Sequence, residues 1–298
     1  FLQGKLPTGI RWLVPVLMTV WVMATIVFRG PAVALLIQFA PLAELPKAGA
    51  LIVLVMGLVG ALGPVLGLIL KSLGASPTFI LGAIALAIGA SILYSALPKH
   101  TLVLPEQDSQ PPGSFRLLSA LFTVGIGAGL EINLLLGIFP PVLQTQLSHV
   151  LGNELISSSI LLVAALTAVP LGELTVKLGV TRAMLVGLGA MMGLMGLTLL
   201  NSSPILAAGL ILAFGTAFGL IFISQIPFAL AMVPPAHAGL GTGLYFGGMG
   251  AATALSSILM KQPGGMTAAS AFGWAAIAFL VTALCLTVCQ RLAPKIVS

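Results

Sequence analysis

The sequence predicts an all-α polytopic membrane protein, because of its composition, the length of its apolar runs and an internal repeat. Of its 298 residues, 59% are hydrophobic and 6% are charged, and mean hydropathy is +1.18, whereas soluble domains carry about 25% charged residues. No soluble core of this length hides so much apolar surface, so lipid must solvate the chain. A backbone in lipid is helical or forms a closed barrel. Barrel strands alternate apolar and polar residues, but these runs stay apolar for about 20 residues, as membrane helices do.

Nine apolar runs are long enough to be predicted as membrane spans. They cover residues 12–28, 48–70, 76–97, 117–139, 155–176, 183–200, 204–233, 238–260 and 268–290. The longest polar interval, residues 98–116, divides them into a partial N-terminal bundle of three helices (residues 1–97) and a C-terminal bundle of six (residues 117–298).

The Lys and Arg residues predict the orientation. With the linker at residues 98–116 in the cytoplasm, eight of the 12 Lys and Arg lie on the cytoplasmic side and four lie outside. This excess of cytoplasmic positive charge is typical of inner-membrane proteins. We therefore expect a multi-pass protein of the cell (inner) membrane with a cytoplasmic C-terminus.

An internal repeat links the two ends of the chain. When the sequence is shifted by 190 residues, eight of the 27 positions from Ala48 to Gly74 are identical, against about two or three expected by chance in a chain of this composition. Each copy reads as one helix-length apolar run that ends near a Lys. Parallel repeats of membrane spans are typical of transporters built from two similar halves. The repeat predicts a twelve-helix architecture of which this chain carries helices four to twelve.

Several function classes find no support in the sequence. It has no phosphate-binding loop, no nucleophile elbow and no Cys/His cluster, so we expect neither an enzyme nor a bound metal or cofactor. The 12 Lys and Arg are scattered and form no basic patch, which argues against a nucleic-acid partner. The expected partners are the lipid bilayer, a small-molecule substrate, and a proton or sodium ion.

Glu131 is the sharpest candidate functional residue, because it lies in the middle of the run 117–139. An ionisable group at membrane depth is costly unless it is paired or faces water, so it marks a candidate site by default. We predict that Glu131 takes up and releases a coupling proton. The alternative is a structural carboxyl held by hydrogen bonds within the bundle. Asn133 lies about 200° further round the helix and does not share this face.

Four further polar residues lie within or beside apolar runs. Arg29 is either a partner for an anion or for Glu131, or an arginine that extends to the membrane interface. Gln38, Gln225 and Tyr245 either contact a polar substrate or form hydrogen bonds between helices.

Glycine and proline mark two places where helices bend or pack closely. Gly63, Pro64 and Gly67 interrupt the run 48–70, because Pro64 removes a backbone hydrogen bond. Gly247 and Gly250 belong to a glycine-rich stretch in the run 238–260. The first place predicts a hinge, a close helix contact or direct contact with a substrate, and the second predicts close packing along which helices slide.

Several motifs of this chain resemble those of the major facilitator superfamily. Gly63-Pro64-x-x-Gly67 followed by Ser76-Pro77-Thr78-Phe79 resembles its fifth and sixth helices, and residues 172–182 resemble its loop between helices eight and nine. Residues 234–239 resemble the loop between helices ten and eleven, with His237 where an Arg is common. Residues 29–41 are similar to the end of helix four in the sugar–cation (glycoside–pentoside–hexuronide) symporters and in the pigment-complex assembly proteins of photosynthetic bacteria.

This resemblance implies a secondary active transporter that works by alternating access between two bundles and is coupled to a proton or cation gradient. The expected substrate is a small polar or amphipathic solute. Two alternatives stay open: export of an apolar compound, and a non-transporting assembly protein that binds a pigment or another membrane subunit.

Overall fold

Every regular element in the described part of the chain is helical. The computed structural model describes residues 44–96, 113–148, 150–234, 237–261 and 265–292, together with Leu13, Val16, Leu17 and Val20. The helices in these ranges are α2 (Leu45–Ala61), α3 (Gly63–Leu73), α4 (Ala75–Ala96), α5 (Phe115–Gln146), α6 (Asn153–Leu178), α7 (Val180–Leu200), α8 (Pro204–Ala231), α9 (Ala238–Met260) and α10 (Ala268–Leu292).

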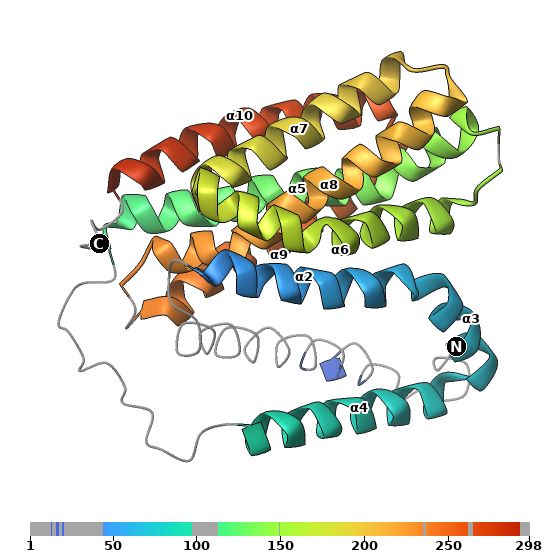
Figure 1. Cartoon of the computed structure of the whole chain (residues 1–298), viewed down its shortest axis with the longest axis horizontal. Helices are drawn as coiled ribbons and strands as arrows, with labels where there is room; N and C mark the ends of the chain where they lie inside the picture. Colours follow the sequence, from blue (N-terminus) through green and yellow to red (C-terminus); the bar gives the residue numbers. More distant parts are fainter. Residues whose placement is uncertain are drawn as a thin grey trace.

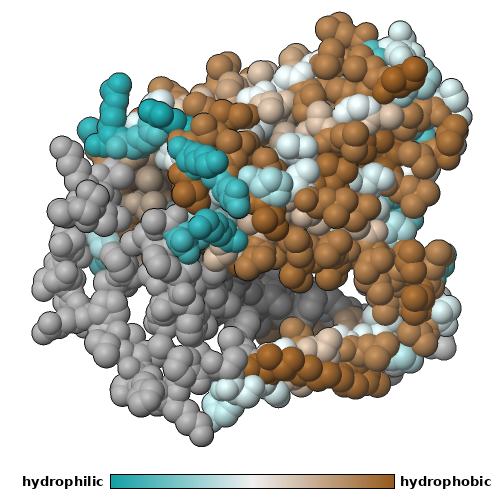
Figure 2. All heavy atoms as spheres, in the orientation of Figure 1, coloured by the Kyte–Doolittle hydropathy of each residue, from teal (hydrophilic) through white to brown (hydrophobic). Residues whose placement is uncertain are grey.

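Helices α5 to α10 are each long and apolar enough to cross a membrane, and α2 with α3 makes a seventh span if the bent pair counts as one. The chain is therefore a polytopic membrane protein. Figure 2 shows apolar surface along the flanks of the bundle and hydrophilic side chains gathered near one end. Of the nine predicted spans, 76–97 corresponds to α4, whose apolar part, Pro77–Ile92, is shorter than a full span. The predicted span 12–28 lies almost entirely outside the described residues.

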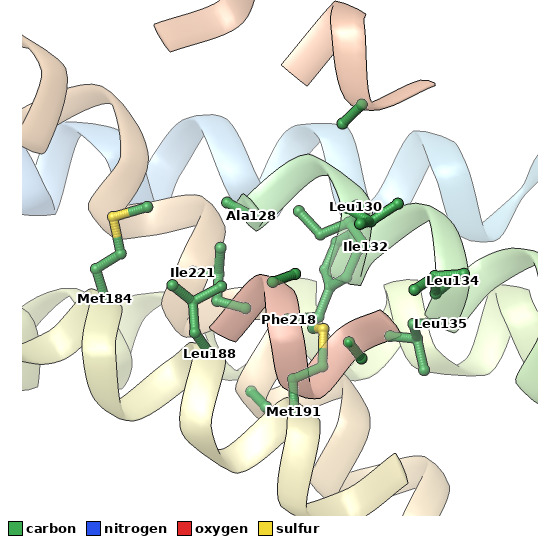
Figure 3. Close-up of a cluster of buried hydrophobic side chains, with 14 of the residues drawn as sticks. Ala128, Leu130, Ile132, Leu134, Leu135, Met184, Leu188, Met191, Phe218 and Ile221 are labelled. Atoms are coloured by element: carbon green, nitrogen blue, oxygen red, sulfur yellow. The ribbon is translucent and has the colours of Figure 1, made fainter. Parts of the chain in front are cut away.

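The six long helices form one bundle, and α2 packs along its side. Helix α5 packs between α9 and α10, while α8 packs against α6 and α7. Helix α2 lies along α6 and also touches α8, whereas α4 lies apart from these six helices and contacts α3 (Figure 1). Figure 3 shows the apolar centre, where Leu135 of α5, Met191 of α7 and Phe218 of α8 belong to one buried cluster.

Glycines permit backbone-to-backbone contact between α5 and α9. A Cβ at Gly125 would overlap the carbonyl oxygen of Tyr245, and a Cβ at Gly248 would overlap that of Phe122. Small residues let membrane helices approach to backbone contact, which is where packing and weak hydrogen bonds between them are strongest. The close contact therefore falls on Gly248 and not on Gly247 or Gly250, since a Cβ at Gly250 would meet nothing within 4 Å.

The predicted interruption of the run 48–70 is a bend of 53° between α2 and α3. Proline lacks an N–H, and its ring clashes with the carbonyl four residues earlier, so Pro64 stands in the first turn of a new helix. The bend turns the chain away from the bundle, and no residue of α3 is buried.

The two copies of the repeat differ in shape at this point. Helix α9 is continuous from Ala238 to Met260, and Ala254 stands where the first copy has Pro64. The first copy therefore departs from the single helix-length run that the repeat predicts, because only it carries a helix-breaking proline.

Candidate functional site

A cavity of about 670 Å³ lies between α2 and α3, the C-terminal half of α5 and the start of α6. Volumes of about 300–1,000 Å³ are typical of sites for small molecules. The cavity is lined by Gly60, Gly63, Pro64, Gly67, Leu68, Lys71, Leu136, Gly137, Pro140, Pro141, Asn153, Glu154, Ser157, Ser158 and Leu161.

The bend at Pro64 forms one wall of this cavity. Gly63, Pro64 and Gly67, predicted as a hinge or packing site, all line it. A Cβ at Gly63 or Gly67 would meet nothing within 4 Å, so these glycines leave space and are not packed against another helix. Because α3 turns away from α6, the space between the two helices stays open.

The mouth of the cavity is polar. Lys71 comes from the last turn of α3, and Glu154 from the first turn of α6. Asn153, Ser157 and Ser158 add hydrogen-bonding groups beside them. Neither Lys71 nor Glu154 forms an ion pair with another described residue. Two opposite charges and several neutral polar groups therefore face the same opening, free to bind a solute.

A second, apolar cavity of about 190 Å³ lies further along α2 and α6, where both helices face α8. It is lined by Val53, Met56, Gly57, Leu161, Ala164, Phe218 and Phe222. The rings of Phe218 and Phe222 are stacked, with centroids 4.4 Å apart. Leu161 lines both cavities, so its side chain stands at the boundary between a polar and an apolar compartment.

Close contacts between α2 and α6 occur beside the apolar cavity, at Gly57, and further along the helices, at Gly172. A Cβ at Gly57 would lie 2.8 Å from the carbonyl oxygen of Leu161, and a Cβ at Gly172 would lie 2.7 Å from the Cβ of Ala50. On α8, the carbonyl oxygen of Ile223 is 3.0 Å from a Cβ built at Gly49. The seam between α2 and α6 is therefore open at the end marked by Asn153 and closed at the end marked by Gly172.

Glu131 lies in the interior of the bundle and lines neither cavity. It is fully buried, and neither of its carboxyl oxygens has a hydrogen-bond partner. Pro140, a cavity residue nine positions further along α5, lies about 180° round the helix from Glu131. Glu131 instead lies on the same face of α5 as Gly127 and Leu135. This face is turned towards α10, since a Cβ at Gly127 would overlap the hydroxyl of Thr282. The alternative prediction of a hydrogen-bonded carboxyl finds no partner in the described chain.

Gln225 on α8 and Tyr245 on α9 are also buried and lie outside both cavities. The side-chain oxygens of both residues have no hydrogen-bond partner. The ring of Tyr245 packs edge-on against Phe228 and Phe246, with centroids 6.3 and 5.5 Å away. Neither residue is therefore placed to touch a solute in the cavities.

Asn133 lies on a different face of α5 from Glu131, and its Nδ2 donates to the hydroxyl of Thr253 on α9 at 3.3 Å. Arg29 and Gln38 lie outside the described residues.

The polar mouth of the cavity was not singled out from the sequence. Lys71, Asn153 and Glu154 read as ordinary ends of apolar runs, where charged residues are expected. A weak signal was the run Ser157-Ser158-Ser159 inside a predicted span, since polar residues in membrane helices tend to face protein or water.

Comparisons with protein-family models and with curated proteins gave no match.

Proposed function

We propose that this protein is a secondary active transporter that moves a small solute across the membrane by alternating access. The observation that carries the proposal is the seam between α2 and α6, which holds a 670 Å³ cavity at one end and is closed by glycine contacts at the other. A transporter of this kind binds its solute at an interface of helices that opens to one side at a time. The resemblance to the major facilitator superfamily supports the same mechanism.

In this mechanism the present conformation is one of two end states. With the linker at residues 98–116 in the cytoplasm, the open mouth at Lys71 and Glu154 faces outwards and the closed end at Gly172 faces inwards. Rocking α2 against α6 would close the mouth and separate Gly172 from Ala50. Contacts made by glycine and alanine suit this motion, because few side chains interdigitate across them.

Glu131 is the proposed coupling group. A carboxylate buried without a partner is costly, so this conformation favours the protonated, neutral acid. Release of the proton would require the rocking motion to bring water or a cation to the carboxyl. Since Glu131 lies away from both cavities, the coupling would act through the packing of α5 and not through direct contact with the solute. A sodium ion is the alternative coupling species.

Uptake into proteoliposomes tests the proposal. We expect an inward proton gradient to drive uptake of at least one member of a panel of radiolabelled amino acids, sugars and organic cations. Glu131→Gln preserves the shape of the side chain and should abolish this gradient-driven uptake while the protein stays folded. Glu173→Gln, on an exposed position of α6, is the matched control and should leave uptake unchanged. Absence of flux for every solute with the folded wild-type protein would contradict the proposal and favour an assembly protein.

A second candidate function, export of an apolar compound, is favoured by the apolar cavity alone. Phe218, Phe222 and Met56 would hold such a compound without any polar group. This candidate predicts that Lys71 and Glu154 contribute nothing to binding.

A further inference from the structure

The two cavities lie in line along α6. Glu154, Leu161 and Ala164 occupy successive levels of this helix, and a rise of 1.5 Å per residue places about 15 Å between the first and the last. On the opposite wall, Gly60 lines the polar cavity and Gly57, one turn earlier on α2, lines the apolar cavity. The cavities are therefore neighbouring compartments of one seam.

Leu161 is the side chain that separates the compartments. Its Cδ1 would lie 2.9 Å from a Cβ built at Gly60, so the leucine rests directly on the glycine. The backbones of α2 and α6 also meet at this level, since a Cβ at Gly57 would lie 2.8 Å from the carbonyl oxygen of Leu161. Rotation of the Leu161 side chain to another staggered rotamer, together with a small separation of the two helices, would join the polar and apolar compartments.

The two compartments suit opposite ends of one molecule. Lys71 can pair with a carboxylate and Glu154 with an ammonium group, and charge-assisted hydrogen bonds are the strong ones. Val53, Met56 and the stacked rings of Phe218 and Phe222 offer only apolar contact.

We propose that the seam binds an amphipathic zwitterion, with its charged head between Lys71 and Glu154 and its apolar tail past Leu161 against Phe218 and Phe222. The inference rests on the proposed function, because it takes this seam as the path of the solute. It narrows the substrate from any small solute to an amphipathic zwitterion. A purely polar solute would leave the apolar cavity unused. A purely apolar solute would leave the two charges at the mouth unused.

Binding measured by equilibrium dialysis tests this proposal. The full chain is placed in lipid nanodiscs, with empty nanodiscs to subtract partition into lipid. The probe is radiolabelled α-aminodecanoic acid, which joins a zwitterionic head to an octyl tail. It should bind at least about tenfold more tightly than alanine, which lacks the tail, and than decylamine or decanoic acid, which each lack one charge. Equal binding of alanine, or of either single-charge analogue, would overturn the proposal.

Two sets of variants localise the binding. Lys71→Gln and Glu154→Gln should each weaken binding of α-aminodecanoic acid about tenfold, while Lys177→Gln, an exposed lysine of α6 outside both cavities, should not. Gly60→Ala adds a methyl group in contact with Leu161 and should hinder entry of the octyl tail into the apolar cavity. It should therefore weaken binding of α-aminodecanoic acid but not of alanine. Gly209→Ala on α8, where a Cβ meets nothing within 4 Å and which lines neither cavity, is its control. Unchanged affinity in Lys71→Gln, Glu154→Gln and Gly60→Ala would overturn the proposal.

This experiment separates the proposal from the proposed function, because dialysis requires no gradient and no transport. If α-aminodecanoic acid does not bind but another solute is taken up, only the zwitterion proposal fails. If it binds as expected but no solute crosses the membrane, only the transport function fails.

Discussion

Two kinds of charged residue occur in this protein, and their surroundings assign them different roles. Glu131 is fully buried, with no partner for its carboxyl oxygens. Lys71 and Glu154 line the mouth of an open cavity and stay hydrated. A proton or a sodium ion would neutralise the buried carboxylate of Glu131, whereas Lys71 and Glu154 lie where a solute in the cavity can contact them. The proposed transport mechanism therefore places coupling in the interior of the bundle and recognition in the seam.

Replacement of Glu131 by an apolar side chain tests its place at the residue scale. A buried polar group without a partner costs about 1–3 kcal/mol, so Glu131→Leu should raise the free energy of unfolding by a similar amount while it abolishes coupling. Thermal unfolding in detergent, followed by intrinsic fluorescence, measures the change. A lower melting temperature for Glu131→Leu would mean that the carboxyl has a stabilising partner. Glu173→Leu, at an exposed position, should shift the melting temperature little.

The burial of Glu131 could be predicted from the sequence, but the position of the cavity, which Glu131 does not line, could not. A lone carboxyl in a long apolar run has few places to lie other than the interior of a bundle. The cavity depends on how α3, α5 and α6 are placed relative to one another. Its polar residues, such as Lys71 and Glu154, lie far apart in the chain, and sequence periodicity says nothing about such distances.

At the scale of helices, prolines explain where the predicted ends differ from the observed ones. The run 117–139 was predicted to end before Pro140, yet α5 continues through Pro140 and Pro141 to Gln146. Membrane helices tolerate proline, because neighbouring groups satisfy the freed carbonyls. Pro64 does break its helix. Runs without internal proline were predicted closely, as for α9, whose bounds are Ala238–Met260.

The bend between α2 and α3 can be tested by removal of Pro64. Pro64→Ala restores the missing N–H and should straighten the pair, as Ala254 permits in α9. Spin labels at Lys47 and Ser72, both exposed, should then lie further apart by double electron–electron resonance. Gly67→Ala should leave that distance unchanged. An unchanged distance in Pro64→Ala would mean that the contacts of α3 with α4 and α6 hold the bend.

The side-chain amides of Gln146 and Asn201 join the end of α5 to the end of α7 by hydrogen bonds. Gln146 Nε2 donates to the carbonyl oxygens of Thr198 at 2.8 Å and Asn201 at 3.1 Å. Asn201 Nδ2 donates to Gln146 Oε1 at 2.9 Å. Gln146→Ala removes all three of these hydrogen bonds, although Asn201 keeps its hydrogen bonds with Ser203. The substitution should lower the free energy of unfolding by about 1–3 kcal/mol.

A double-mutant cycle checks this amide pair. Because the two side chains form one network, Gln146→Ala combined with Asn201→Ala should cost less than the sum of the single changes. Thr145→Ala is the control, since its hydroxyl bonds only within its own helix, to the carbonyl of Val142. Full additivity of the two changes would show that the amides act independently.

At the scale of the whole molecule, the asymmetry of the α2–α6 seam is the central feature. One end holds a cavity with charged residues at its mouth, and the other end is closed by contacts too short for an added methyl group. The sequence predicted a bundle interface through the resemblance to transporters, but it could not predict which end is open. In the proposed mechanism, which end is open depends on a small difference in packing energy between two arrangements of the same helices.

A larger residue at the closed end should shift this balance. Gly172→Val places methyl groups against Ala50 and should force α2 and α6 apart at that end, so that the opposite end closes. Gly193→Val on α7, where a Cβ meets nothing within 4 Å, is the control and should leave the distribution of conformations unchanged. The distances described below measure both variants.

Spin-label distances across the two ends of the seam test alternating access most directly. One pair, Ser72 with Leu155, spans the open end, and a second pair, Lys47 with Lys177, spans the closed end; all four positions are exposed. Double electron–electron resonance in nanodiscs should show that Gly172→Val shortens the Ser72–Leu155 distance and lengthens the Lys47–Lys177 distance together. A longer Lys47–Lys177 distance with an unchanged Ser72–Leu155 distance, or two distances that never change, would contradict alternating access along this seam.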